Sequence, residues 1–154
     1  MVVGYDVDYM CDDMTFNKVM FSLASDHWST PKDTYDALDK EFHFNDDPCP
    51  LGGVSGLDRE WGTSTFVNPP YSKIKDWVTY GFNQARKGKT VVMLIPSRTD
   101  TRWWHDYCMK SAEIRFIKGR LKFGGSKNSA PFPSAIVIFK YPPNADKKIA
   151  DKSL

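Results

Sequence analysis

The sequence has few cysteines and no long hydrophobic run, and both features exclude classes of protein. Its three cysteines, Cys11, Cys49 and Cys108, are an odd number without close spacing, so a disulfide-stabilised scaffold is not expected. No apolar run approaches the roughly 18 residues that a membrane-spanning helix needs. The first residues are acidic, whereas a secretory signal begins basic and continues apolar. We therefore expect a soluble, cytoplasmic protein with no membrane partner.

Metal-ligand spacing is also lacking. His27, His43 and His105 have no ligand spacing with the cysteines, so we expect no metal site. The 154 residues suffice for one compact domain but not for two, and no internal repeat or linker divides them. We expect an N-terminal extension at 1–25, a domain at 26–141 and a polar tail at 142–154. The extension has one helical pattern, formed by Phe16, Val19, Met20 and Leu23.

The net charge of +2 conceals an uneven distribution of charge along the chain. Residues 1–71 hold 4 basic and 13 acidic side chains, a balance of −9, whereas residues 72–127 hold 13 basic and 4 acidic, a balance of +9. Such asymmetry is typical of a surface that binds a polyanion. Pairing between the two parts of the folded chain explains it equally well, so charge alone leaves the partner open.

Strands alternate with helices along the chain. We expect helices at 31–41, 73–86 and about 100–111, and strands at 42–46, 64–68, 90–96, 113–117 and 134–139. Thr30 has the character of a helix cap, with Pro31 at the first helical position. The run 90–96 is continuously apolar, as in strands that are buried on both faces of a parallel sheet. The pattern predicts a single α/β domain whose sheet is mostly parallel.

The expected strand at 64–68 ends in Asn68-Pro69-Pro70-Tyr71. In open α/β sheets the carboxyl ends of strands are where ligands bind. Two prolines remove two backbone donors and stiffen the chain. The Asn68 side chain and the Pro69 carbonyl thus offer two acceptors in fixed geometry beside the aromatic face of Tyr71. This arrangement suits a planar substrate that carries an amino group.

Asn-Pro-Pro-Tyr after a strand resembles the catalytic tetrapeptide of S-adenosylmethionine-dependent amino-methyltransferases. Further runs in the same order make the resemblance narrower: Trp28–Pro31, Asp47-Pro48, Gly56-Leu57 with Trp61, Pro96–His105, Gly119–Gly125 and Ala130–Ser134. Together they resemble the small phage-encoded DNA adenine-N6 methyltransferases, the phage Dam family, over roughly residues 26–140. The resemblance implies a compact Rossmann-like methyltransferase sheet in a single domain, S-adenosylmethionine as cofactor, DNA as partner and the cytoplasm of the host cell as location.

The resemblance also implies roles for the box Asn68–Tyr71. Acceptors at Asn68 and Pro69 would stabilise the pyramidal, partly positive nitrogen of the transition state better than the planar ground state. No strong general base is required, because the methyl group is already activated by the cofactor. An adenine within a duplex would have to be flipped out, with Tyr71 as its stacking partner.

The expected cofactor contacts are Thr30, Pro31, Asp47, Pro48 and Asn68. The wider group has an Asp-Pro-x-Cys-Gly-x-Gly run, but here the glycines after Asp47-Pro48 are displaced to Gly52 and Gly53. An ordinary helix cap explains Thr30 almost equally well.

Two further segments are candidate substrate contacts. Arg98, Asp100 and Arg102 follow the strand at 90–96, with Arg102 a candidate phosphate contact, although Asp100 also suits a helix cap. Cations alternate with glycines in the segment 118–127, where Lys118, Arg120 and Lys122 are candidate DNA contacts. A charged loop without a partner is the alternative for that segment.

Other functions on the same scaffold stay open. The acceptor could be cytosine N4, an RNA adenine or a protein glutamine, or the protein could be a catalytically silent module that binds DNA or a host protein. Little chain is left for separate recognition of a target sequence. We therefore expect either a short or relaxed site preference, or a homodimer that supplies the missing surface.

Overall fold

The computed structural model describes residues 28–51, 55–124 and 127–141, which form a small mixed α/β domain. The expected extension at 1–25 and the tail at 142–154 lie outside the described residues. In chain order the elements are α3 (Lys32–Phe42), β1 (Ser64–Val67), the 3-10 turn η1 (Tyr71–Lys73), α4 (Ile74–Ala85), β2 (Thr90–Pro96), the π-helical η2 (Trp104–Cys108), α5 (Met109–Ser111), β3 (Ala112–Phe116) and β4 (Ser134–Phe139). None of the helices in this described part is long and apolar enough to cross a membrane.

The four strands form one sheet in the order β1-β2-β4-β3. β1 pairs with β2 in parallel, but β4 is antiparallel to both of its neighbours. The prediction of a mostly parallel sheet is therefore wrong, because two of the three strand pairs are antiparallel.

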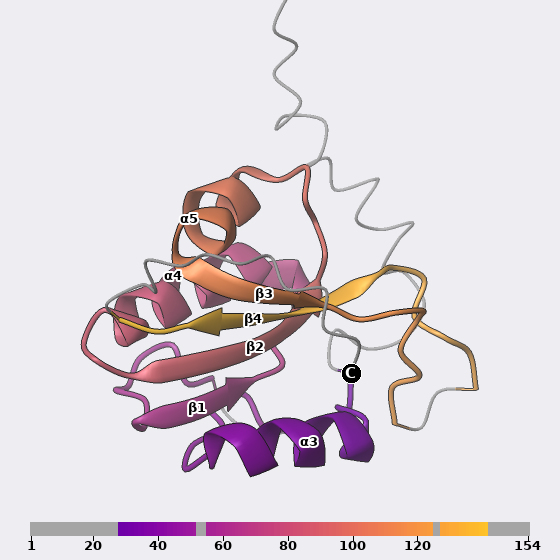
Figure 1. Ribbon diagram of the computed structural model, residues 1–154, viewed down its shortest axis with the longest axis horizontal. Helices are drawn as coiled ribbons and strands as arrows, with labels where there is room; N and C mark the ends of the chain where they lie inside the picture. Colours follow the sequence, from indigo (N-terminus) through magenta and orange to yellow (C-terminus); the bar gives the residue numbers. More distant parts are fainter. Residues whose placement is uncertain (1–27, 52–54, 125–126, 142–154) are drawn as a thin grey trace, which may run out of the picture.

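The direction of the strands explains this outcome. β1, β2 and β3 all run the same way, as Figure 1 shows, and helical segments connect them in sequence. The alternation of helices and strands in the sequence thus correctly predicts that β1, β2 and β3 run in the same direction. β4 follows β3 through the segment 117–133, in whose described residues no helix forms, so it returns in the opposite direction. It then inserts between β2 and β3, which the order of elements in the sequence does not reveal.

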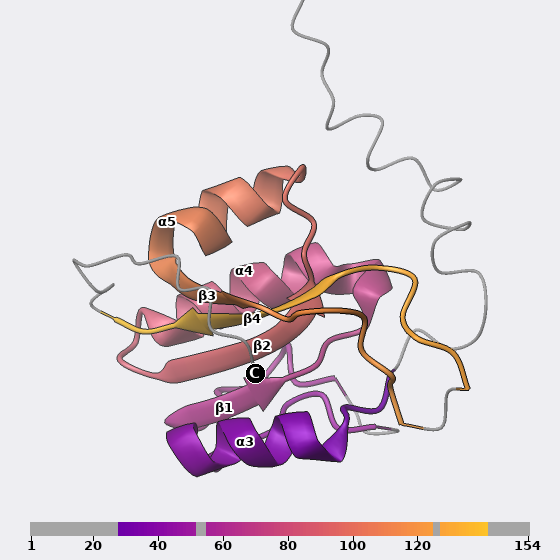
Figure 2. The same ribbon diagram turned by 45° about the vertical axis from the view of Figure 1, so that its right-hand side comes forward.

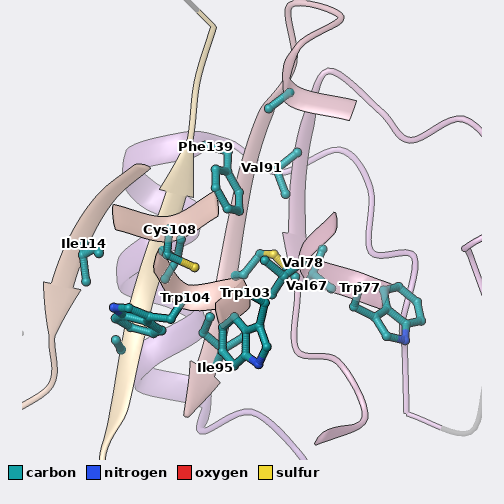
Figure 3. Packing of buried hydrophobic residues seen from close by; sticks show 14 of the residues in the cluster. Val67, Trp77, Val78, Val91, Ile95, Trp103, Trp104, Cys108, Ile114 and Phe139 are labelled. Carbon is teal, nitrogen blue, oxygen red and sulfur yellow. The ribbon is translucent and has the colours of Figure 1, made fainter. Parts of the chain in front are cut away.

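The sheet has a hydrophobic core on each face. Val91, Met93 and Ile95 of β2 pack with α4 and η2, and Figure 3 shows Trp103, Trp104 and Cys108 in this cluster. Val92 and Leu94, which alternate with them, belong to the cluster on the α3 side. Figure 2 shows α3 on the side of the sheet away from α4 and α5. The continuous apolar run of β2 is therefore buried on both faces, as its composition predicts.

Most other predicted elements are confirmed with shifts of about one residue, but the strand expected at 42–46 is not. α3 continues through Phe42, and His43 closes it in a left-handed conformation, with φ 51°, by donating its N–H to the Asp39 carbonyl at 2.8 Å. Only Asp46 joins the sheet, through a parallel bridge to Thr65. The bridge nevertheless places Asp47 beside the end of β1.

Thr30 is not the helix cap that its sequence context predicts. Pro31 occupies the N-cap position, and no side chain caps the helix there. The Thr30 hydroxyl instead contacts the side chain of Asn68. Thr30 therefore contacts a residue 38 positions further along the chain and does not form the helix cap that its local sequence predicts.

An ion pair between buried Arg115 and half-exposed Glu41 joins β3 to α3. Arg115 is 6% exposed, and its guanidinium donates two hydrogen bonds to Glu41, at 2.6 and 2.7 Å, and one to Glu113 at 2.8 Å. Its charged group also lies 5.5 Å from the centre of the Phe42 ring. These contacts fix the C-terminal end of α3 against the sheet.

We expect Arg115→Met to lower the free energy of unfolding by about 2–3 kcal/mol. Breaking a fully buried pair costs about 3–5 kcal/mol, and the half-exposed Glu41 reduces this cost. Urea denaturation measures the change. The control Lys110→Met removes an exposed pair with Asp106, whose charged atoms are 3.7 Å apart, and should cost less than about 0.5 kcal/mol. Equal effects of the two substitutions would contradict the role of Arg115.

Candidate functional site

Three segments that the sequence singles out meet at one edge of the sheet. Because β1 and β2 are parallel, Asn68 and Ser97 follow their carboxyl ends at the same edge. β4 begins opposite the end of β2, with Ser134 facing Pro96, so the segment 117–133 reaches this edge too. The Ser97 N–H donates to the Pro133 carbonyl at 2.9 Å and ties two of the segments together. This is the edge at which open α/β sheets bind ligands.

The amide of Asn68 has a fixed orientation. Asn68 is 8% exposed, and its Nδ2 donates to the Trp28 carbonyl at 2.5 Å and to the Thr30 hydroxyl at 3.0 Å. A carbonyl can only accept a hydrogen bond, so the nitrogen and not the oxygen of the amide must face Trp28. Both amide hydrogens are thus used, and the oxygen points elsewhere.

The Asn68 Oδ1 atom is buried and has no hydrogen-bond partner among the described residues. A buried acceptor without a partner costs about 1–3 kcal/mol, so such atoms in a native protein call for an explanation. Asn68 lines a cavity, but Oδ1 itself is covered by protein, so a ligand N–H or O–H group would reach this atom only after neighbouring groups move. The unpaired oxygen is the strongest evidence for a binding site in the described structure.

The cavity beside Asn68 has a volume of about 310 Å³. It lies between the start of α3, the end of β1 and the residues after Asp46, and its wall combines aromatic rings with polar groups. The lining residues are Trp28, Ser29, Thr30, Lys32, Tyr35, Asp47, Cys49, Leu51, Phe66 and Asn68. Three of the expected cofactor contacts, Thr30, Asp47 and Asn68, are therefore brought together.

Asp47 supplies a carboxylate at the exposed side of the cavity. Its Oδ1 accepts a hydrogen bond from the Cys49 N–H at 3.0 Å. Displacement of water by the surrounding protein raises the pKa of this carboxyl above its ordinary value, and the neighbouring Asp46 carboxylate adds to the rise. A shifted pKa in a cavity wall marks Asp47 as a candidate functional group, although its exposure to solvent and the opposing effects of the Cys49 N–H and Arg59 keep the shift small.

Pro31 and Pro48, two further expected cofactor contacts, do not line the cavity. Pro31 is the N-cap of α3 and its carbonyl accepts the Tyr35 N–H at 3.0 Å. Pro48 packs so closely on Gly56 that a Cβ atom added to residue 56 would lie 2.4 Å from the Cβ of Pro48. Both prolines hold the backbone that carries the neighbouring lining residues.

Sequence reasoning missed several lining residues. Tyr35 and Phe66 have the spacing of core residues, and they do pack together, with ring centres 5.1 Å apart, while also reaching the cavity. Lys32 and Leu51 carry no local signal of a site. Trp28 belongs to the run Trp28–Pro31, which is part of the family resemblance, and this run is the only sequence signal that points to Trp28 as a site residue.

The Tyr71 ring is not presented as an open stacking surface. Tyr71 is 4% exposed and packs edge-on against Phe132, with ring centres 5.2 Å apart, and against Phe123 at 6.5 Å. Burial raises the pKa of its phenol, so the group is protonated at neutral pH. A base could stack on Tyr71 only after these rings move. The carbonyl of Pro70 accepts the Lys73 N–H at 3.2 Å. The role of the Pro69 carbonyl as second acceptor stays a prediction.

The remaining candidate contacts lie outside the cavity wall. Arg98 and Asp100 approach each other, with Nε and Oδ1 3.8 Å apart, and Arg102 is exposed near the start of the following helical segment. Asp100 is the candidate helix cap, but it is Thr101 that donates to the Arg98 carbonyl, with its N–H at 3.1 Å and its hydroxyl at 2.7 Å. Lys118, Arg120 and Lys122 are exposed in the segment that crosses the edge of the sheet, which is drawn in orange in Figure 1.

A cavity beside an unpaired amide oxygen, at the carboxyl edge of a mixed sheet, is the arrangement expected of an α/β protein that binds a ligand with a hydrogen-bond donor. Residues 54–149 match the model of the family described as DNA N-6-adenine-methyltransferase (Dam), and the chain belongs to this family. The match includes Asn68–Tyr71 and the segment 117–133, which carries Lys118, Arg120 and Lys122 and is called the basic segment below. Residues 28–51, which form much of the cavity wall, precede the match. Comparisons with curated proteins and with solved structures found no match.

Within the described ranges of the chain, no group of three or more His, Cys, Asp or Glu side chains could hold a metal ion. The cysteines in these ranges, Cys49 and Cys108, are both buried and free of disulfides.

We expect Asp47→Asn to stabilise the protein at pH 7, by less than about 1 kcal/mol. The raised pKa means that the ionised carboxylate is disfavoured in the folded state, and asparagine removes the charge while keeping an acceptor for the Cys49 N–H. The difference should shrink as the pH falls through the raised pKa and disappear below 3.8, because Asp47 is then protonated in both folded and unfolded chains. Urea unfolding at several pH values measures it.

The exposed Asp58→Asn serves as the matched control and should change the free energy of unfolding at pH 7 by less than about 0.5 kcal/mol. If Asp47→Asn destabilised the protein at pH 7, the carboxylate would be a stabilising element and not a group held for a ligand.

Proposed function

We propose that this protein transfers a methyl group from S-adenosylmethionine to the exocyclic N6 amino group of adenine in DNA. The observation that carries the proposal is the buried, unpaired Oδ1 of Asn68, whose amide is locked with the oxygen free to accept. Membership of the DNA N-6-adenine-methyltransferase (Dam) family supports adenine as the acceptor and DNA as the substrate.

The chemistry asks for acceptors and not for a strong base. The lone pair of an adenine amino group is delocalised into the ring, so this nitrogen is a poor nucleophile. An N–H···Oδ1 bond to Asn68, with a second bond to the Pro69 carbonyl, draws the hydrogens out of the ring plane and favours a pyramidal nitrogen. These bonds strengthen as positive charge develops on that nitrogen, so they stabilise the transition state more than the ground state.

The residues around the cavity fit S-adenosylmethionine. The cavity volume of about 310 Å³ lies at the lower end of the range for small-molecule sites, roughly 300–1,000 Å³. Its aromatic side chains suit a purine ring or a sulfonium, and the carboxylate of Asp47 suits a hydroxyl or an ammonium group. We propose that Trp28, Tyr35, Asp47 and Phe66 hold the cofactor. When bound, it supplies a methyl group on a positively charged sulfur.

The sheet is compatible with a reduced Rossmann-like arrangement. β1, β2 and β3 share one direction, and the proposed site lies at their carboxyl ends, as it does in such sheets. The reversed β4 is the departure from that arrangement. It brings the segment 117–133 to the site.

That segment supplies the proposed DNA contacts. Lys118, Arg120 and Lys122 are exposed and basic, which suits contacts to DNA phosphate. Exposed Arg102 and the Arg98–Asp100 pair follow β2 at the same edge and would extend this surface. An adenine within a duplex must leave the stack to reach Asn68.

We expect Asn68→Ala to lower the formation of N6-methyladenine by at least about 100-fold, which is the cost of removing one group that stabilises a transition state. Labelled S-adenosylmethionine and unmethylated DNA, followed by nucleoside mass spectrometry, measure it. Cofactor affinity, measured by calorimetry, should change by less than about threefold, since the cavity has many other contacts.

The control Asn83→Ala makes the same substitution on the exposed surface of α4 and should retain full activity. The absence of N6-methyladenine from reactions of the unaltered protein with varied duplexes would contradict the proposed function. Retained turnover by Asn68→Ala would contradict the role of Asn68 alone.

A further inference from the structure

The segment Trp28–Thr30 contacts both Asn68 and the basic segment that follows β3. On one side it provides both acceptors for the Asn68 amide, the Trp28 carbonyl and the Thr30 hydroxyl. On the other side Ser29 forms an antiparallel bridge with Gly124, whose N–H donates to the Ser29 carbonyl at 2.9 Å. The segment is therefore anchored on both sides.

The anchor to the basic segment is closely packed. The Trp28 ring lies 5.2 Å from that of Phe123 and 6.5 Å from that of Phe132, centre to centre. A Cβ on Gly124 would lie 3.0 Å from the Ser29 hydroxyl oxygen, so glycine permits the close approach of the two chains. These contacts leave the backbone at Ser29 little room to shift.

The two acceptors for Asn68 have different roles. The Trp28 carbonyl determines which end of the amide faces the segment, because it can only accept. One bond alone still allows the amide to rotate about its last torsion, which has a broad energy minimum. The second bond, to the Thr30 hydroxyl, fixes that rotation and with it the direction of Oδ1.

We propose that Thr30 is a positioning residue, which acts through Asn68 by fixing the direction in which its Oδ1 accepts the substrate amino group. This inference rests on the proposed function, and it assigns Thr30 a role different from the cofactor contact expected from its sequence. Alignment of the acceptor affects the rate of the chemical step more than the affinity for either ligand.

Thr30→Val removes the hydroxyl and keeps the shape of the side chain. We expect kcat to fall about tenfold, the effect of one lost hydrogen bond, while KM for S-adenosylmethionine and for DNA changes by less than about twofold. Thr30→Ser restores the hydroxyl and should return kcat to within about twofold of the unaltered protein. A raised KM for S-adenosylmethionine with unchanged kcat would overturn the proposal, since it would mean that Thr30 contacts the cofactor directly.

The chain offers a matched control. Asn45 Nδ2 donates to the Thr63 hydroxyl at 2.7 Å, an asparagine–threonine pair of the same kind that is exposed at the amino end of β1. Thr63→Val should leave kcat unchanged. A similar fall in kcat for Thr63→Val would show a general effect of such pairs on the fold and would overturn the assignment to Thr30.

A second readout does not depend on methyl transfer. In ¹⁵N-labelled protein, both hydrogens of the Asn68 side-chain amide should be protected from exchange with water, and Thr30→Val should expose one of them while Thr30→Ser protects both. Unchanged protection in Thr30→Val would overturn the proposal. If the unaltered protein did not methylate DNA, the proposed function would fail, and this measurement would still decide whether Thr30 positions Asn68.

Discussion

The hydrogen bond from the Asn68 amide to the Trp28 carbonyl is the interaction on which the rest of the site depends. It fixes the nitrogen of the amide against the protein and leaves the oxygen buried without a partner in the described structure. The cavity also holds the Asp47 carboxyl, whose pKa is raised by burial. A ligand with hydrogen-bond donors or a positive charge would stabilise both groups.

The topology of the sheet determines what surrounds this interaction. Parallel pairing of β1 and β2 brings Asn68 and Ser97 to one edge, and the reversed β4 carries the segment 117–133 to the same place. That segment then closes on residues 28–30 through the bridge between Ser29 and Gly124. Three parts of the site thus depend on one another although they are far apart in the sequence: residues 28–30, the box Asn68–Tyr71 and the segment 117–133.

The sequence predicts the local features well and the long-range ones only in part. The apolar run of β2, the helix α4 and the strand β1, which ends one residue before Asn68, follow from periodicity and composition, because each depends on neighbouring residues. The position of β4 depends on which strands pair, and nothing in the local sequence of residues 134–139 expresses that. Thr30 and Tyr71 illustrate the same limit, since a contact with Asn68 replaced the helix cap and packing against Phe132 buried the expected stacking surface.

The most direct test is a crystal structure of the protein with S-adenosylhomocysteine and a short DNA duplex that contains an unmethylated target adenine. The account predicts that the adenine N6 lies about 3 Å from Asn68 Oδ1 while Nδ2 keeps its bond to the Trp28 carbonyl. An adenine bound away from Asn68, or an Asn68 oxygen that accepts a hydrogen bond from the protein in that complex, would contradict it.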